Sequence, residues 1–257
     1  SSDNQWKFIS EEIRSLKKSF SQKTKIGKRR TDIILLEKEI AYKNEYTLPS
    51  EPVSIVLSKQ GWVRCLKGKV EELKDLKFKD EDSLFISINA NSNDKIIFFS
   101  SNGKAYSLDA SELPSGRGHG TPLKILLDIE EQHSVISVFP YENEKKYIVA
   151  SSVGNGFIVN SNDMLSNRKS GKQVINIKDN QKSIICKKIT GDSVVAIGEN
   201  KKMLIFSLND LPQLSRGKGV RIQKYKDSDL LFLDTFNLDE GLKIKDSAGR
   251  IRTFDNL

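Results

Sequence analysis

The sequence has 257 residues, a length sufficient for one large domain or two smaller ones, and its formal net charge is +8 at pH 7. Its longest apolar runs, such as residues 96–99, are far shorter than the roughly 18 residues of a membrane helix, and its polar start has no signal-peptide pattern. Two cysteines without metal-binding spacing predict reduced thiols, no metal site and a cytosolic protein.

The positive charge is concentrated at the start of the chain. Residues 1–30 contain nine Lys or Arg and three Asp or Glu, so +6 lies there and only +2 remains for the rest. Bulk basicity therefore does not make the larger part of the chain a nucleic-acid binder. That function must be argued from the positions of individual charges.

An amphipathic helix is predicted over residues 3–20. Apolar residues recur there at spacings of three and four, which places one stripe along a helix: Trp6, Ile9, Ile13, Leu16 and Phe20. A basic cluster around Gly27 breaks the pattern, and the two prolines of TLPSEP mark a boundary. We therefore predict a helical and linker segment over residues 1–50 and a second domain over residues 51–257.

Short β-like runs with polar residues between them fill the second domain, from VSIVLS to RIRTFD. Tight hairpin turns recur among them at intervals of 42, 51, 47 and 48 residues, at Gly61, Gly103, Gly154, Lys201 and Gly249. Repeats of this length, with about four strands each, are typical of propeller blades. The sequence thus predicts an all-β, propeller-like domain whose last blade is incomplete.

A basic turn that contains glycine follows each of the first four hairpins, in the segments LKGKV, SGRGHG, SNRKSGK and LSRGKG. Since a radial repeat places equivalent positions on one rim, we expect a discontinuous basic belt. Its predicted members are Arg64, Lys67, Lys69, Arg117, His119, Arg168, Lys169, Lys172, Arg216, Lys218 and Arg221. A curved belt can track DNA, which carries one negative charge per ~1.7 Å of axis. Without a base-reading helix, contact should be mainly to the backbone.

A structural reading of the turns stays open, because glycine supplies positive φ in tight turns. Evidence for catalysis is thin. The two histidines, His119 and His133, lie in different parts of one repeat, and neither a GxSxG nor a Walker motif occurs. The aromatic residues Trp62, Tyr106 and Phe157 fall on predicted strands and are expected in the core.

Four long segments, in order, resemble the C-terminal domain of the A subunit of bacterial DNA topoisomerase IV, in the topoisomerase IV and gyrase A family. They read LPSEPVSIVLSKQGWVRCLKG, SSNGKAYSLDASELPSGRGHGTPL, ASSVGNGFIVNSNDMLSNRKSGK and MLIFSLNDLPQLSRGKG. The resemblance implies a β-pinwheel, a propeller-like disc of about five four-stranded blades, preceded here by a short helical segment. It also implies that the rim binds and bends double-stranded DNA without sequence preference.

Further expectations come from the same resemblance. The partners would be DNA, the topoisomerase IV B subunit, and a second A subunit in an A2B2 heterotetramer. That type IIA enzyme passes one duplex through another in decatenation, supercoil relaxation and chromosome segregation. Its ATP and Mg requirements belong to the core and the B subunit, so no cofactor is expected in this chain. The family's DNA-cleaving tyrosine also belongs to the core, so this chain alone should be inactive.

Two alternatives remain beside this interpretation. Gyrase A carries a QRRGGKG-like box in this domain, and the closest pieces here, GRGHG and SRGKG, favour topoisomerase IV over a gyrase domain with a degenerate box. A propeller-like protein-interaction module is the other alternative, since the net charge after residue 30 is low. The expected location is the cytoplasm at the nucleoid, with a peripheral position at the inner face of the membrane as the alternative.

Overall fold

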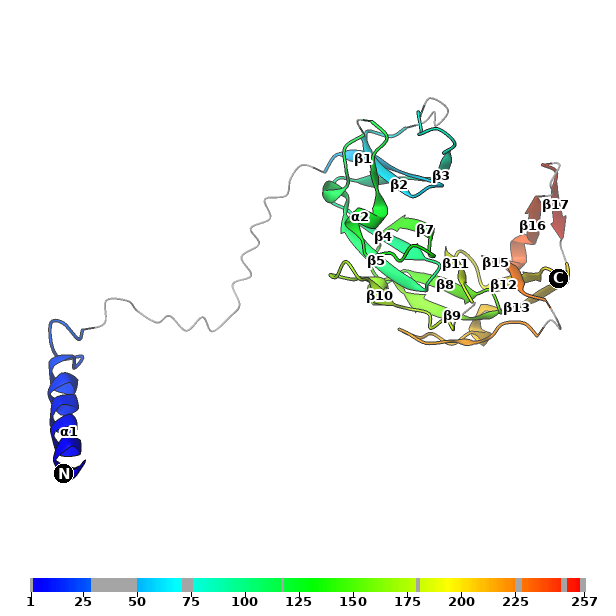
Figure 1. The fold of residues 1–257 in the computed structure, drawn as a ribbon. Coiled ribbons are helices and arrows are strands. Elements are labelled where there is room, and N and C mark those ends of the chain that lie inside the picture. Colours follow the sequence, from blue (N-terminus) through cyan, green and yellow to red (C-terminus); the bar gives the residue numbers. More distant parts are fainter. Residues whose placement is uncertain are drawn as a thin grey trace. The chain divides into compact units, whose positions relative to one another are not determined.

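The computed structural model describes residues 2–28, 50–70, 76–116, 118–178, 181–224, 228–245 and 249–254. The chain divides into two compact units, Ser1–Tyr46 and Thr47–Leu257. Figure 1 shows a single long helix in the first unit and a succession of strands in the second. Within the described ranges, no helix combines the length and the hydropathy of a membrane span.

The helix of the first unit, α1, spans Ser2–Ser19 and confirms the predicted apolar periodicity. Asp3 in its first turn and Lys17 and Lys18 in its last turn match the polarity of the helix macrodipole. The apolar stripe is exposed, with 67% of Trp6 and 58% of Ile13 accessible. Within the described structure, α1 therefore contributes no core.

The second unit is built of short strands. In chain order they are β1 (Pro52–Ser58), β2 (Trp62–Lys67), β3 (Leu84–Asn91), β4 (Lys95–Ser100), β5 (Lys104–Asp109), β6 (Thr121–Pro122), β7 (Val135–Pro140), β8 (Lys146–Ser151), β9 (Asn155–Asn160), β10 (Lys172–Gln173), β11 (Ser183–Lys188), β12 (Ser193–Gly198), β13 (Met203–Ser207), β14 (Val220–Arg221), β15 (Leu230–Phe236), β16 (Leu242–Lys245) and β17 (Ile251–Phe254). Short helical turns join some of them: η2 (Ala110–Glu112), α2 (Leu123–Leu126), α3 (Ser161–Met164), η3 (Leu208–Asp210) and η4 (Leu238–Glu240).

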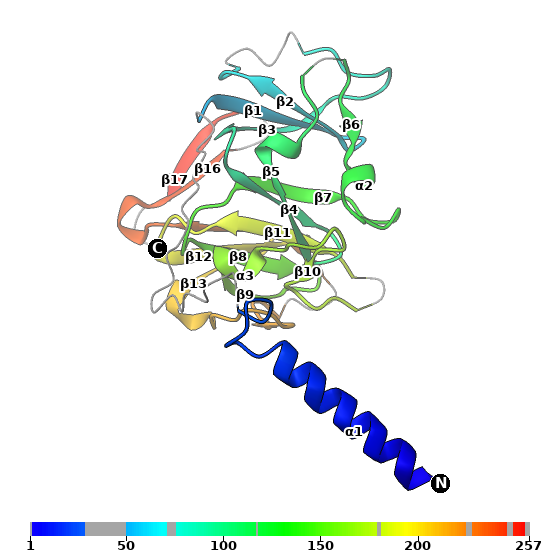
Figure 2. The same ribbon diagram turned by 90° about the vertical axis from the view of Figure 1, so that its left-hand side faces the viewer.

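These strands pair into five antiparallel sheets in the described part of the chain. Three sheets have four strands, in the orders β3-β1-β2-β6, β10-β5-β4-β7 and β11-β8-β9-β14. The fourth sheet has three strands, β13-β12-β15, and the fifth has two, β16-β17. Figure 2 shows the sheets of the first repeats side by side in chain order. The all-β, propeller-like prediction is confirmed, and three of the five predicted blades are complete.

Each four-stranded sheet receives its fourth strand from the next repeat. β6 follows β5 in sequence, yet it pairs with β2, with Trp62 opposite Pro122. In the same way β10 pairs with β5 and β14 pairs with β9. The exchanged strands have only two residues each, so their β-pattern is too short to predict from sequence. The exchange fastens every complete sheet to its successor.

The predicted frame of hairpin turns is confirmed by the backbone. All five turn residues have positive φ: Gly61 (82°), Gly103 (74°), Gly154 (77°), Lys201 (63°) and Gly249 (83°). Glycine adopts this region freely, whereas an L-residue with a Cβ does so at a cost. The turn between β12 and β13 is therefore strained at Lys201.

Replacing Lys201 by Gly should raise the free energy of unfolding by about 0.5–1 kcal/mol, because it removes the left-handed strain at one turn. Urea unfolding monitored by circular dichroism measures the change. Lys202→Gly is the matched control, since it removes the same charge one residue later without a positive φ. The strain argument fails if Lys201→Gly is no more stable than Lys202→Gly.

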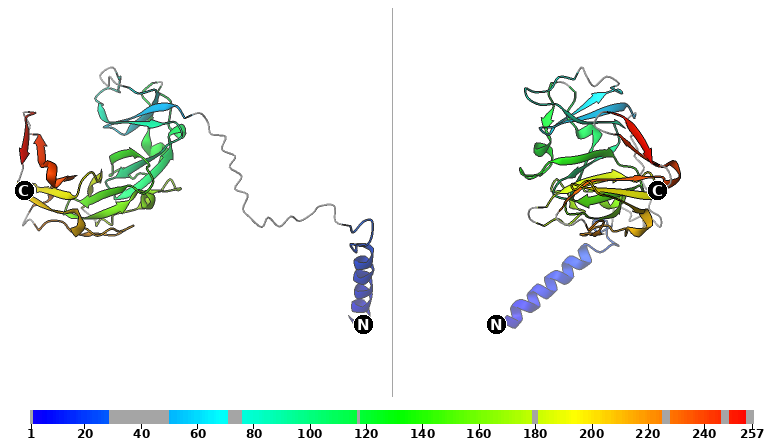
Figure 3. Two further views of the ribbon diagram at one scale, coloured as in Figure 1. Left: turned by 180° about the vertical axis from the view of Figure 1, so that it is seen from behind. Right: turned by 90° about the vertical axis from the view of Figure 1, so that its right-hand side faces the viewer.

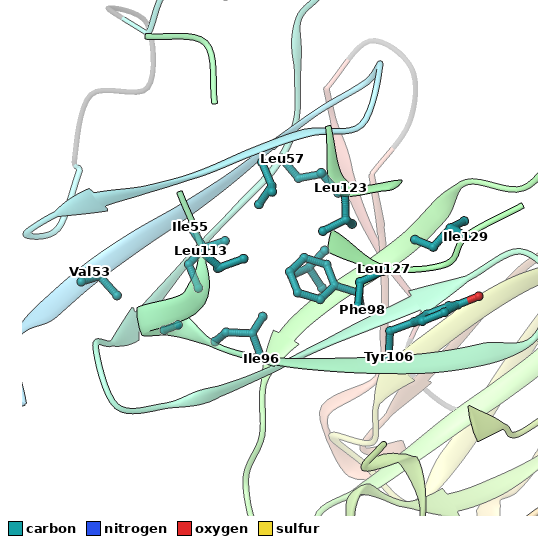
Figure 4. Packing of buried hydrophobic residues seen from close by; sticks show 13 residues of the cluster. Val53, Ile55, Leu57, Ile96, Phe98, Tyr106, Leu113, Leu123, Leu127 and Ile129 are labelled. Atoms are coloured by element: carbon teal, nitrogen blue, oxygen red, sulfur yellow. The ribbon is translucent and has the colours of Figure 1, made fainter. Parts of the chain in front are cut away.

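The hydrophobic core lies between successive sheets, in three clusters. The first joins residues of β1 and β2 to residues of β4, β5 and α2, among them Ile55, Phe98 and Leu123. Figure 4 shows the Phe98 ring amid these aliphatic side chains. Of the three aromatic residues predicted in the core, Tyr106 and Phe157 are fully buried and Trp62 is only partly buried. Because each cluster takes side chains from two neighbouring repeats, the repeats stabilise one another.

Candidate nucleic-acid interface

The three basic turns lie at one edge of the sheets. Residues 115–120, 166–171 and 215–219 lead directly into β6, β10 and β14, which are edge strands. At the opposite edge, β3, β7, β11 and β15 lie in contact one after another, and Figure 3 shows the strands from behind. We call the row formed by residues 115–120, 166–171 and 215–219 the turn edge.

Backbone hydrogen bonds link each later turn to the segment that follows the turn before it. The N–H of Asp128, shortly after the first turn, donates to the carbonyl of Lys169 in the second at 2.9 Å. The N–H of Gly217 in the third turn donates to the carbonyl of Val174 at 3.0 Å, and the N–H of Asn176 donates back to Gly217 at 2.7 Å. The turn edge is therefore a connected series in chain order.

The last glycine of each turn is required by packing. Gly120, Gly171 and Gly219 have φ of 91°, 71° and 75°. A Cβ on Gly120 would lie 2.3 Å from the carbonyl oxygen of Val63, and one on Gly219 would lie 2.3 Å from that of Gly156. Side chains cannot approach backbone this closely. These glycines bring the turn against the preceding sheet, so the structural reading holds for them.

The cationic side chains of the turn edge, by contrast, are not used by the fold. The described lysines and arginines of the turn edge and of the strands it leads into are all exposed, as is His119: Arg168, Lys169, Lys172, Arg216, Lys218 and Arg221. Arg216 makes one long hydrogen bond, from Nε to Asn176 Oδ1 at 3.5 Å. No ion pair joins any of them to a carboxylate in the described ranges. Predicted Arg117 lies outside the described residues. The others are available to an anionic ligand.

Arg64 does not belong to this surface. It is 5% exposed, and its guanidinium donates to the carbonyls of Gly118 at 2.6 Å and Lys77 at 2.9 Å. The guanidinium also lies 5.3 Å from the centre of the Phe78 ring. Arg64 thus holds the first turn in place through its hydrogen bond to Gly118. The prediction that Arg64 contacts DNA is corrected: its buried side chain supports the turn.

Lys67 and Lys69 do not form a fourth equivalent turn. Lys67 ends β2 opposite Val53, 3.8 Å from the carboxylate of Glu51, and both lysines are exposed. The next described strand is β3, which pairs within its own sheet. The sequence spacing already differs at this position: Lys67 follows Gly61 by 6 residues, whereas Arg117 follows Gly103 by 14. The aligned frame of basic turns therefore contains three members.

Ser101, His133 and Glu130 lie close together among the described residues. Ser101 Oγ lies 3.2 Å from His133 Nδ1, and His133 Nε2 lies 3.8 Å from the Glu130 carboxylate. Ser101 is only 4% exposed and its Oγ accepts the N–H of Ser134 at 3.2 Å. A buried hydroxyl offers no approach to a substrate, so this group ties the hairpin to a loop. Among the described residues no metal-binding cluster of His, Cys, Asp or Glu occurs.

Comparison with known proteins places these features in a family. The family model "DNA gyrase C-terminal domain, beta-propeller" matches residues 94–142 and 192–232. The DNA topoisomerase 4 A subunit of Rickettsia bellii is 35% identical over 98% of this chain and 34% of its own length. The Caulobacter vibrioides protein of the same name is 40% identical over 81% of this chain and 27% of its own length. The chain thus spans about a third of these relatives.

Solved structures show the same relationship. The C-terminal domain of Escherichia coli ParC superposes with a TM-score of 0.69 at 33% identity, over 74% of this chain and 81% of that domain. A DNA gyrase A C-terminal domain, at 18% identity and a TM-score of 0.53, shares the fold. The repeated hairpins, the exchanged strands and the similarity to the ParC domain all indicate the same family. The chain belongs to the family of C-terminal domains of the DNA topoisomerase IV A subunit.

Proposed function

We propose that this chain binds double-stranded DNA along its turn edge, through the phosphate backbone, and bends it. One observation carries the proposal: linked turns at equivalent positions of successive repeats present exposed lysines and arginines, at residues 168–169 and 216–218, with no carboxylate partner in the described ranges. Cations in such a row neutralise DNA phosphates and thereby release the counterions that are condensed on the duplex. The turns contribute no helix to a groove, so their contacts carry little base information.

In the whole protein, this chain would position a duplex for ATP-dependent double-strand passage. The relatives, which are named as A subunits of DNA topoisomerase 4, are about three times as long as their matched region. We therefore assign the DNA-cleaving tyrosine, the Mg and the ATP-hydrolysing B subunit to parts beyond this chain, within an A2B2 assembly. The contribution of this chain is DNA binding, and we expect no cofactor in it.

Anisotropy titration of labelled 30-base-pair duplexes at several salt concentrations tests the proposal. Three to six phosphate contacts should give a slope of log K against log salt of about −3 to −5. Duplexes of unrelated sequence should bind within a few-fold of one another. The chain alone should not relax supercoiled plasmid. Absence of binding at low salt, or an affinity set by sequence, would contradict the proposal.

A further inference from the structure

A polar hollow of about 980 Å³ lies beside the turn edge, outside the predicted belt. It is bounded by the β4–β5 hairpin, the loop before β7 and the segment between β10 and β11. Arg216 reaches it from the third turn. Its lining residues are mostly cations and amides: Asn102, Lys104, Glu130, Gln132, His133, Gln173, Asn176, Ile177, Lys178, Gln181, Lys182 and Arg216.

The charge of the hollow is unbalanced. Its one described carboxylate, Glu130, is shared among Lys104 Nζ and His133 Nε2, each at 3.8 Å, and the amide of Gln132 at 2.9 Å. Lys178 and Lys182 are exposed, and in the described part of the chain neither they nor Arg216 pairs with a carboxylate. Three cations thus remain uncompensated around one concave surface.

One wall of the hollow is held by hydrogen bonds. Gln173 Nε2 donates to the carbonyls of Asn102 at 3.0 Å and Ile175 at 2.6 Å, which ties the exchanged strand β10 to the hairpin turn. A Cβ on Gly103 would lie 2.3 Å from the carbonyl oxygen of Ile175, so the two segments are in direct contact.

We infer that this hollow holds phosphate groups of a DNA strand, with Lys178, Lys182 and Arg216 as the main cations. The inference rests on the proposed function and extends it away from the rim. Arg216 belongs to both surfaces, and its turn is hydrogen-bonded to the segment that lines the hollow. A strand that follows the turn edge can therefore enter the hollow beside the third turn without leaving the cationic surface.

The double variant Lys178→Gln/Lys182→Gln tests this inference in the full 257-residue chain. Removing two phosphate-binding cations should lower DNA affinity about sixtyfold at 0.1 M salt and flatten the slope of log K against log salt by about 1.8. Lys145→Gln/Lys146→Gln is the matched control. It removes two exposed lysines at the start of β8, the end of that strand away from the hairpin turn at Gly154. The control should bind DNA within about twofold of the wild type, as distant charges are screened.

Tripolyphosphate, titrated at constant ionic strength by calorimetry, separates DNA from a free polyphosphate as the source of the anion. A hollow variant that no longer binds tripolyphosphate but keeps full DNA affinity would overturn the inference in favour of a free ligand. A hollow variant equal to the control with both ligands would overturn it outright. If the wild type binds no DNA, the proposed function fails together with the inference. If the wild type binds DNA and the hollow variant binds it equally well, the inference fails and the proposed function stands.

Discussion

Replacing Arg117, Arg168 and Arg216 together by Glu should lower the affinity for duplex DNA by on the order of a thousandfold at 0.1 M salt. The three residues occupy equivalent positions in successive repeats, and Arg168 and Arg216 are exposed. Removing one phosphate interaction costs about eightfold in affinity through counterion release and flattens the salt slope by about 0.9, and the introduced carboxylates add repulsion. Single variants should show roughly a third of the effect on a logarithmic scale.

The melting temperature of the same variants separates binding from folding. If the arginines only shape the turns, Glu should lower the melting temperature and leave affinity per folded molecule unchanged. If they bind phosphate, the melting temperature should stay within a few degrees while affinity falls equally on unrelated duplexes. An unchanged affinity and slope in a folded triple variant would defeat the proposed role of the turn edge.

Two glycines of one turn should differ sharply in their tolerance of alanine. Gly118 and Gly120 both have positive φ, 75° and 91°. A Cβ on Gly118 would meet nothing within 4 Å, whereas one on Gly120 would lie 2.3 Å from the carbonyl oxygen of Val63. Gly118→Ala should therefore cost only the backbone strain, about 1–2 kcal/mol of unfolding free energy. Gly120→Ala should cost about 3 kcal/mol or more, because the turn must also move off β2.

Urea unfolding of the two alanine variants measures this difference, with Gly118→Ala as the matched control for strain. Both variants keep the same net charge, so DNA affinity per folded molecule should be unchanged in Gly118→Ala. Equal losses of stability would show that close packing against β2 does not explain the terminal glycine.

The repeat frame could be predicted from sequence because glycine marks it. Turn glycines at Gly61, Gly103 and Gly154 are dictated by local backbone geometry, and local geometry is written in neighbouring residues. The apolar stripe of α1 is similarly local. Strand exchange is different. The partner of β6 lies in the preceding repeat, and two residues are too few to specify a partner by pattern.

The candidate site was predictable only in part for the same reason. Exposed cations in register, such as Arg168 and Arg216, follow from the frame. Arg64 has the same residue type, but its burial under the first turn depends on a hydrogen bond to Gly118, 54 positions away. Lys178 and Lys182 were missed because they lie outside the frame, and only folding gathers them beside Arg216.

Because strands are exchanged, the segment of sequence that repeats is not the same set of residues as the sheet that folds together. Three repeats in succession each give a strand, β6, β10 or β14, to the sheet before it. An extra repeat copied in frame among the first three would therefore leave every four-stranded sheet complete, and the loss of one would do the same. Among the described residues, the last two sheets have three and two strands. Domains built this way can evolve a longer or shorter turn edge by whole repeats, without passing through a form in which a four-stranded sheet loses its edge strand.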